Sequence, residues 1–511
     1  MNAAWKYHNA TKHSVASLRA NRHYLDWENK PRPFKIYPNL EPIPLPREWP
    51  PSRVPALAAI AATGVQPDGR RVPDLVSLAR ALHFSAGITH KKVYPGGEEQ
   101  YFRAAACTGG LYHIDLYVIC GDLPGLSAGV YHFGPHDFGL HQLRSGDYRR
   151  ILVDATGQEP AMQRAPVILA CASTYWRNSW KYQARAYRHC FWDCGTVLAN
   201  LLAVAAADEL PARVVCGFVD ATVERLLDLD RRREGALALV PLGFDPRPAR
   251  PPPPALPVLA LGTVPLSPRA VDYPAIREMH AASALQAADE VKAWREGDVA
   301  PVPEPSPPTG QSFPLPQAGQ GTRPNETIDE VIGRRGSTRR FARVPIQLEQ
   351  LSTVLHCATR GVAADFGVSP FGASPTDLYL IVNAVDGLPS GAYVYHHAQH
   401  ALELLRAGNF RREAGHLGLG QEIPADANVD VFLLCNLDTV LSRFGNRGYR
   451  VAQLDAAIIG GKIYLAAYAL RLGASGLTFF DDDVTDFFSP HAAGKSVMFL
   501  VAGGRSKKPG T

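Results

Sequence analysis

The sequence has little of several features that mark particular classes of protein. Its longest apolar runs, such as LLAVAAA, are far shorter than the roughly 20 residues that cross a bilayer. The N-terminal stretch is polar and lacks the apolar core of a signal peptide. We therefore expect a cytoplasmic protein with no membrane partner.

The sequence also lacks a large excess of positive or negative charge. The 511 residues carry a formal net charge of +5, with no run of like charges that resembles a basic arm, which argues against a nucleic-acid partner. No Gly-rich dinucleotide fingerprint is present, so a nicotinamide partner would bind only transiently. Hydrophobic residues make up 46% of the chain, which is typical of globular domains with sizeable cores.

Paired cysteines are missing as well. None of the eight cysteines forms a C-x-x-C pair, and in a chain of this length we expect reduced, packed thiols, as in the cytosol. Cys190 and Cys194, with His189 beside them, imitate a metal site. Because they form one cluster without a second pair of ligands, we expect no metal.

The sequence does contain an internal repeat. The stretch GLSAGVYHFGPHDFGLHQLRSGDYR, from residue 125, resembles GLPSGAYVYHHAQHALELLRAGNFR, from residue 387. Tyr117 and Tyr379 stand upstream with the same offset of 262 residues, and KYQARAYR and RFGNRGYR follow downstream with that offset again. We infer two related modules in one chain.

A proline-rich stretch separates the two copies. Such a stretch cannot form a core and favours stiff, extended conformations. We predict modules at 1–248 and 326–511, joined by a linker at 249–325 that contains a helical piece and wraps over the surface. The polar N-terminal stretch YHNATKHS is expected to be a flexible tail, and the alternative is a segment that drapes over a neighbouring part of the molecule.

Each module has the same order of predicted elements. A helix precedes a glycine-containing loop, three strands, a long helix and a final strand. The long helices, CGTVLANLLAVAAADEL and IIGGKIYLAAYALRL, are apolar nearly all round and should be buried at the interface between the copies. We expect an α+β fold in which helices flank a mostly antiparallel sheet.

The second module opens with a cationic segment, GRRGSTRRFARVPIQL. Arg335, Ser337 and Arg339 bring two guanidiniums and a hydroxyl together, which suits a phosphate, although short arginine runs are also common on solvated surfaces. An offset of 273 between His83 and His356 aligns this segment with the first module. The matching residues there are Ala62, Gly64 and Gln66.

The opposite loss occurs further along the chain. Lys181 and Tyr182 open the stretch KYQARAYR, whereas Arg443 and Phe444 replace them in the second module. Each module therefore keeps one half of the candidate chemistry. This complementarity is the strongest functional signal in the sequence.

Together these motifs resemble the nitroreductase superfamily of FMN-dependent flavoproteins, and within it the SagB-type, azoline dehydrogenase-like enzymes. The resemblance covers both modules and rests on the R-x-S-x-R segment, the loops RAAACTGGLYHIDLY and VSPFGASPTDLYLI, the segment LTFFDDDVTDFF and KYQARAYR. In that superfamily two protomers pair and FMN lies at their interface. The resemblance therefore implies an intramolecular pseudo-dimer and an FMN-dependent oxidoreductase.

Carried onto this sequence, the resemblance implies roles for named residues. The FMN phosphate would be held by the cationic segment, with one more arginine after the last strand: Arg335, Ser337, Arg339 and Arg505. The flavin ring would lie against a first-module loop whose glycines let backbone N–H groups approach it. This loop comprises Ala105, Ala106, Cys107, Thr108, Gly109 and Gly110. Lys181 and Tyr182 would be the catalytic pair, and one working site per chain is expected.

The sequence also departs from the family. The loop reads Ala-Cys-Thr-Gly-Gly where the family usually carries serines, and the second module reads Pro370-Phe371-Gly372 in its loop. Phe371 is a candidate to fill the vacated second site. Both departures favour one FMN per chain.

The implied chemistry transfers a hydride to FMN while a base removes a proton, which would convert a peptidyl thiazoline or oxazoline to the aromatic azole. Lys181 is the candidate base and must be neutral to act. If residues 178–195 are one helix, Arg185 and Arg188 share its face and lower its pKa, while Tyr182 donates or relays a proton. The arginines could instead pair with Asp193 and backbone carbonyls.

Two other functions remain open. One is an NAD(P)H-dependent reductase of nitro, quinone or ene substrates, and the other is a flavin-binding scaffold without turnover, because each half has lost a motif. The substrate would be a small molecule or a peptide. No peptide-recognition domain is evident, so a separate protein would deliver a peptide.

Overall fold

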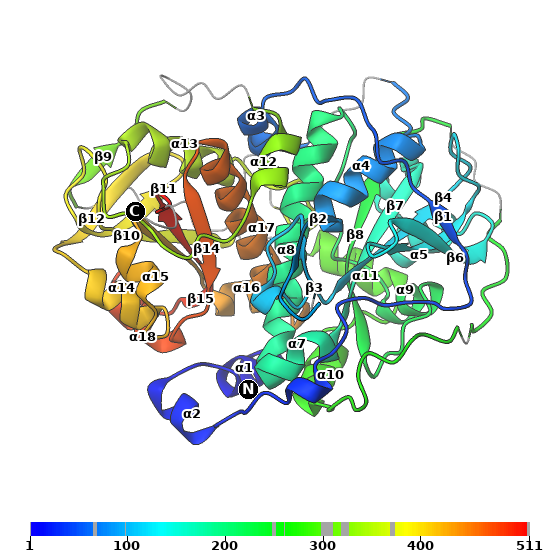
Figure 1. The fold of residues 1–511 in the computed structure, drawn as a ribbon, viewed down its shortest axis with the longest axis horizontal. Helices are drawn as coiled ribbons and strands as arrows, with labels where there is room; N and C mark the ends of the chain where they lie inside the picture. The colour runs from blue at the N-terminus through cyan, green and yellow to red at the C-terminus, as the bar shows by residue number, and fades with distance from the viewer. Residues whose placement is uncertain are drawn as a thin grey trace.

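Two copies of one unit lie side by side in the computed structural model of the protein, and two long helices run between them (Figure 1). The structure describes residues 2–64, 69–97, 99–247, 252–259, 261–297, 310–317, 326–367 and 374–507. Within these ranges every pairing in the two large sheets is antiparallel. The predicted α+β class and the two-module arrangement are confirmed.

The first module is built on a sheet with the described strand order β1-β6-β5-β4-β7-β8. Its central strands have the sequences IDLYVIC and VILACAST and are buried along their whole length, because helices and loops cover both faces. The strands are β1 (Pro42–Pro44), β4 (Ile114–Cys120), β5 (Gly129–Gly134), β6 (Gly139–Ser145), β7 (Val167–Thr174) and β8 (Glu234–Leu242).

The second module repeats this sheet with the described order β14-β15-β13-β10-β11-β12-β9. Its edge strand β9 comes from the predicted linker and pairs with β12, as β1 pairs with β6 in the first module. The strands are β9 (Ser312–Pro314), β10 (Thr376–Val382), β11 (Gly391–His396), β12 (Ala401–Ala407), β13 (Val429–Cys435), β14 (Gly473–Leu477) and β15 (Ser496–Gly504).

A separate hairpin, β2 (Ile88–Val93) and β3 (Glu99–Arg103), marks the first module. The offset between the copies falls from 273 to 262 residues across this stretch, so the first module is longer here by the 11 residues that accommodate the hairpin. Its second strand leads directly into the glycine loop. This hairpin was not predicted from the sequence, although the change in offset signals an insertion.

The central helices α8 (Ala186–Ala207) and α17 (Arg447–Ala469) pack against each other between the modules. Glycines let them approach closely: a Cβ at Gly195 would lie 2.5 Å from the Ala457 Cβ, and one at Gly461 would lie 2.5 Å from the Ala199 Cβ. The predicted buried helix pair is therefore confirmed. The helical stretch Tyr175–Ala207 has the length and hydropathy of a membrane span, but 89% of its apolar window is buried inside the protein.

A short helix at the start of each copy packs at the junction between the two modules, below α7 in Figure 1. Helix α1 (Ala3–Ala10) presents the His8 carbonyl to the Arg188 guanidinium, and helix α10 (Pro274–Ala282) presents the His280 carbonyl to Arg450 in the equivalent way, at 2.7 and 2.8 Å. The N-terminal stretch is therefore a packed helix, and the expectation of a flexible tail is wrong. The helical piece of the predicted linker is the second copy of α1.

The remaining helices surround the two sheets. Four of them begin at a side chain that accepts a hydrogen bond from a free backbone N–H group: α2 at Ser14, α4 at Asp74, α12 at Thr327 and α16 at Asn436. At α12, Glu330 completes a capping box. Those before the second copy are α2 (Val15–Ala20), α3 (Ala56–Ala61), α4 (Leu75–Ala86), α5 (Arg149–Ala155), α6 (Pro160–Arg164), α7 (Tyr175–Tyr182) and α9 (Asp220–Leu226). The others are α11 (Ala288–Glu296), α12 (Ile328–Arg334), α13 (Leu348–Thr359), α14 (Arg411–Leu417), α15 (Glu422–Asp426), α16 (Leu437–Phe444) and α18 (Asp481–Phe488).

Candidate active site

Helix α7 carries the candidate catalytic pair in its last turn. Arg177 fixes this helix to the sheet, because its guanidinium donates hydrogen bonds of 3.0 and 2.7 Å to the buried Asp115 carboxylate. The helix ends where Gln183 adopts a φ of 50°. Lys181 is exposed at this end, and its Nζ lies 5.4 Å from the centre of the Tyr182 ring.

The predicted flavin loop lies against this pair. Gly109 and Gly110 have φ values of 65° and 66°, which favour glycine. A Cβ at Gly109 would lie 2.8 Å from the Tyr182 hydroxyl, so only glycine lets the phenol approach the loop this closely. A Cβ at Gly110 would meet nothing within 4 Å, so the backbone there faces open space.

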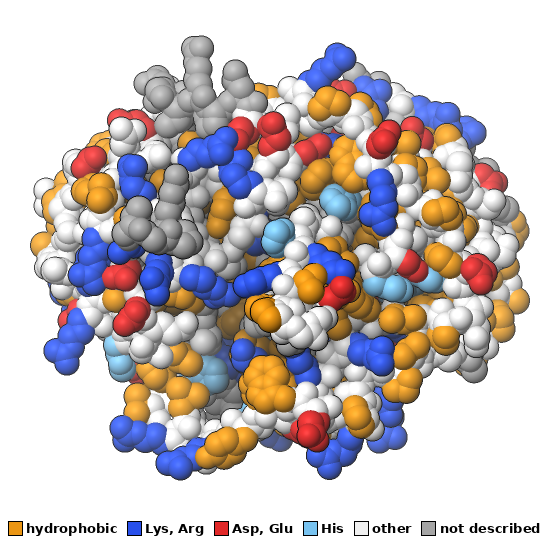
Figure 2. All heavy atoms as spheres, in the orientation of Figure 1, with side chains coloured by type: hydrophobic (Ala, Val, Ile, Leu, Met, Phe, Trp, Pro, Cys, Tyr) orange, Lys and Arg blue, Asp and Glu red, His pale blue; other side chains and the backbone are white. Residues whose placement is uncertain are grey.

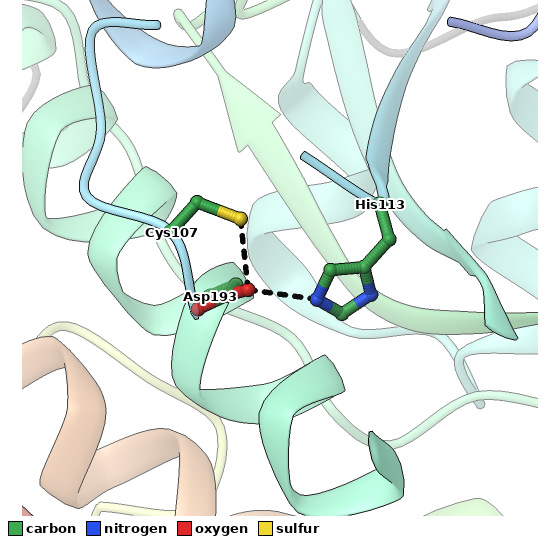
Figure 3. A group of neighbouring side chains, drawn as sticks. All are labelled: Cys107, His113 and Asp193. Atoms are coloured by element: carbon green, nitrogen blue, oxygen red, sulfur yellow. Dashed lines mark hydrogen bonds and ion pairs between the residues drawn. The ribbon is translucent and has the colours of Figure 1, made fainter. Parts of the chain in front are cut away.

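Asp193, on α8, anchors the other side of the loop (Figure 3). Its buried carboxylate accepts hydrogen bonds from the Thr108 backbone at 2.9 Å, the Cys107 thiol at 3.0 Å and His113 Nε2 at 2.7 Å. Thr196 lies one turn further along α8 and donates to the Ala106 carbonyl at 2.7 Å. These anchors were not predicted from the sequence, because their partners lie about 80 to 90 positions away along the chain.

The cationic segment of the second module reaches the same loop. Arg335 follows α12 and donates to the carbonyls of Ala104 at 2.8 Å and Arg103 at 3.0 Å, at the start of the loop. Ser337 Oγ lies 3.5 Å from the Tyr464 hydroxyl. Arg339 is exposed, and within the described part of the chain no hydrogen bond or ion pair engages its guanidinium.

Arg505 lies at the C-terminal end of β15, beside this segment. Its carbonyl accepts a hydrogen bond from the Ala342 N–H at 2.8 Å, and its own N–H donates to Asn428 Oδ1 at 2.8 Å. Ala342 follows Arg339 by three residues. The structure therefore brings the backbone of Arg505 to the edge of the cationic segment. On the face shown in Figure 2, Lys and Arg side chains gather between the modules.

The surroundings shift the pKa values of the candidate catalytic pair in opposite directions. Partial desolvation of the lysine side chain and the Arg339 guanidinium lower the pKa of Lys181. Burial, followed by the Asp193 carboxylate, raises the pKa of Tyr182. The lysine therefore becomes neutral at a lower pH than an ordinary lysine, while the phenol keeps its proton. A base and a hydrogen-bond donor stand side by side.

Arg185 and Arg188 do not face Lys181. The helix break at 183–185 turns both arginines toward the module interface, where they are buried and bind Asp481 of the second module at 2.9 and 2.6 Å. The expectation that they lower the pKa of Lys181 is wrong, because Arg339 supplies that cation. Of the alternative, the pairing with backbone carbonyls is confirmed, because Arg185 donates to the Thr11 carbonyl and Arg188 to the His8 carbonyl. Their acidic partner is Asp481 and not Asp193.

Comparison with known proteins assigns the fold. Two stretches, residues 75–244 and 332–503, match the profile of the nitroreductase family. This chain belongs to the nitroreductase family. Members are oxidoreductases and are typically FMN-dependent.

Individual relatives agree with that assignment. The nitroreductase-like protein MJ1384 of Methanocaldococcus jannaschii is 26% identical over 164 residues, which are 31% of this chain and 82% of that protein. The crystal structure of a nitroreductase-like protein from Anabaena variabilis is also similar, with 27% sequence identity and a TM-score of 0.78. The match covers 99% of this chain and 100% of the chain in that structure. The whole tandem arrangement therefore has a counterpart of known structure.

A more distant likeness is to the E. coli microcin synthetase McbBCD complex with truncated pro-MccB17 bound. It is 18% identical, with a TM-score of 0.31, and covers 47% of this chain and 86% of that chain.

The reciprocal site of this nitroreductase-family chain has different chemistry. Phe444 has no hydroxyl, and its buried ring packs 5.1 Å from the Trp294 ring. Ala62 and Gly64, which replace two of the candidate phosphate-binding residues, line a small pocket together with Lys462. Gln66 and the Pro370-Phe371-Gly372 segment lie outside the described residues.

The residues at the composite site fit flavin mononucleotide. Arg335, Ser337 and Arg339 provide guanidinium and hydroxyl donors for a phosphate, and none of them is paired with a carboxylate in the described structure. The open backbone at Gly110 leaves room for a flat ring beside the loop. These donors come from one module and the loop from the other, so the fit depends on the pairing of the modules.

Proposed function

We propose that this chain is an FMN-dependent oxidoreductase of SagB type with one working site per chain. The observation that carries the proposal is that Tyr182, from the first module, and Arg335, from the second, both contact the glycine loop, with Arg339 close enough to act on the pKa of Lys181. Neither module alone contains both the base and the phosphate-binding residues. The substrate would be a small molecule or a peptidyl azoline, and a peptide would require a separate protein that delivers it.

Bound flavin would supply an acceptor for a hydride from the substrate. Lys181 Nζ acts in its neutral form, which its lowered pKa favours, and takes the proton from the neighbouring carbon. Tyr182 stays protonated and donates a hydrogen bond that orients the substrate. The substrate thus loses a hydride and a proton and gains one double bond.

The first test is the flavin content of the purified protein. We expect one FMN per chain, and two would contradict the loss of the second phosphate site. Lys181→Ala should keep this flavin content while substrate oxidation falls. Unchanged turnover in Lys181→Ala would refute the catalytic role of the lysine, and no flavin even after incubation with FMN would favour a scaffold without turnover.

Membership of the nitroreductase family supports a second candidate, an NAD(P)H-dependent reductase. Such an enzyme would consume NAD(P)H with a generic nitro or quinone acceptor. Because a reductase receives its hydride from the nicotinamide, it needs no base that removes a substrate proton. Retained NAD(P)H oxidation in Lys181→Ala would therefore favour the reductase over the azoline oxidase.

A further inference from the structure

Asp193 connects the glycine loop to the central helix of the first module. Besides the Thr108 N–H, the Cys107 thiol and His113, it accepts a hydrogen bond of 2.7 Å from the Thr108 hydroxyl. Its side chain is 5% exposed, so water does not compete for these donors. One buried carboxylate therefore holds two consecutive loop residues and the histidine just beyond the loop.

The hydrogen bonds of this cluster show which atoms donate and which accept. Ser173 Oγ lies 2.8 Å from His113 Nδ1 and 3.3 Å from the Cys190 thiol, which donates to it. With the serine hydroxyl donating to Nδ1, His113 carries its proton on Nε2 and donates it to Asp193. Burial, followed by the Asp193 carboxylate, raises the pKa of Cys107, so its thiol stays protonated and acts as a donor. Cys107, His113 and Asp193 lie close enough to bind a metal, yet donated protons already occupy the contacts between them.

The equivalent aspartate of the second module has different neighbours. Asp455, 262 residues after Asp193, accepts hydrogen bonds from the hydroxyls of Ser374 and Thr376 among the described residues. Pro370 and Pro375 stand at the positions of Thr108 and His113, and a proline has neither a backbone N–H nor a side-chain donor. The sequence of the second module therefore lacks the donors that Thr108 and His113 give to Asp193.

We propose that Asp193 is a positioning residue that fixes the Cys107–Thr108 segment for flavin binding, and that Asp455 has no such role. The inference rests on the proposed FMN function. Gly109 and Gly110 give the following residues conformational freedom, so the loop needs an external anchor to present one backbone surface. Four hydrogen bonds to one buried carboxylate supply that anchor before any cofactor arrives.

The test compares Asp193→Asn with the matched variant Asp455→Asn. Hydrogen–deuterium exchange of residues 103–112 in the apoprotein measures the anchor without flavin, and titration with FMN measures binding. We expect exchange to rise and FMN affinity to fall, each by about tenfold, in Asp193→Asn, because hydrogen bonds to a charged group are lost. Asp455→Asn should stay within about twofold of the wild type on both measurements. Thr108→Val removes a single hydroxyl and serves as a second variant if Asp193→Asn fails to fold. It should raise exchange and lower FMN affinity by less than Asp193→Asn does.

Each result has a distinct meaning. Unchanged exchange in Asp193→Asn overturns the anchor. Faster exchange with unchanged FMN affinity overturns the positioning role while leaving the proposed function standing. Equal losses of FMN affinity in Asp193→Asn and Asp455→Asn would reveal a general structural effect and would also overturn the positioning role. If the wild-type protein binds no FMN, the proposed function and the positioning role fall together, and the exchange data still report on the anchor alone.

Discussion

Gln183 and Gly445 occupy equivalent positions 262 residues apart, and both hold a left-handed backbone, with φ of 50° and 57°. Their ψ values are −138° and −154°, a region that glycine enters readily and other residues enter with strain. Each ends the helix before the central helix. The first module therefore stores backbone strain directly after Tyr182.

Replacing Gln183 by Gly should stabilise the protein by about 1 kcal/mol. Relief of the strain is worth ~1–3 kcal/mol, and the lost hydrogen bond from Asn21 Nδ2 to the glutamine side chain costs ~1 kcal/mol. Urea unfolding measures the change. Gly445→Ala is the matched control and should be less stable than the wild type, because it introduces the same strain. A destabilised Gln183→Gly would show that the Asn21 contact outweighs the strain.

The pKa of Lys181 predicts the pH dependence of turnover. A lysine base acts when neutral, so turnover should rise as the pH rises through its pKa, and burial and Arg339 place this rise below the pH expected for an ordinary lysine. Arg339→Gln should move the rise to higher pH when measured at saturating FMN. Lys181→Ala should lower kcat by about 10²–10⁴-fold and abolish the rise. An unchanged profile in Arg339→Gln would show that the arginine does not act on the lysine.

The buried ion pairs between the modules predict a large loss of stability on mutation. Asp481→Asn leaves Arg185 and Arg188 buried without a carboxylate and should lower the free energy of unfolding by about 3–5 kcal/mol. Asp482 is the control, because its contact with Lys12 is mostly exposed and Asp482→Asn should cost less than about 1 kcal/mol. Equal effects would contradict the structural role of the buried pair.

The same ion pairs determine the direction in which the free energy of unfolding changes with pH. Burial acts to raise the pKa of Asp481, but Arg185 and Arg188 outweigh it and hold the pKa well below its usual range. The stabilisation is therefore complete above the pKa of an unfolded aspartate, and it is lost as the pH falls toward the lower folded value. Acid titration of the unfolding free energy should show a smaller loss in Asp481→Asn than in the wild type.

The sequence predicted the features that depend on local pattern or on the repeat. A constant offset between Tyr117 and Tyr379 identified two copies, and an apolar helix in each copy predicted the helix pair at the junction. The complementary losses at the Lys181–Tyr182 pair and at Arg335 predicted half-sites, and the structure brings Tyr182 and Arg335 to the same glycine loop. These inferences need only spacing and composition.

Features that depend on distant partners were not predictable in the same way. Arg188 appeared close to Lys181 on a helical face, yet its partner Asp481 lies 293 residues away and the intervening helix breaks. Asp193 gave no local signal of its role, because its donors come from a loop about 85 residues earlier. The pairing of α1 with α10 was hidden because their sequences share little beyond His8 and His280.

The contact between Gly109 and Tyr182 gives the sharpest test of the site. Gly109→Ala adds a Cβ that would lie 2.8 Å from the Tyr182 hydroxyl, so the phenol must move and kcat should fall by about tenfold or more. Gly110→Ala separates this clash from backbone strain, because Gly110 has nearly the same φ and its Cβ would meet nothing within 4 Å. Both variants should lose similar stability in thermal unfolding, whereas only Gly109→Ala should show the larger loss of kcat at saturating FMN. If the two variants lose kcat equally, the loop conformation and not the approach of Tyr182 limits the reaction.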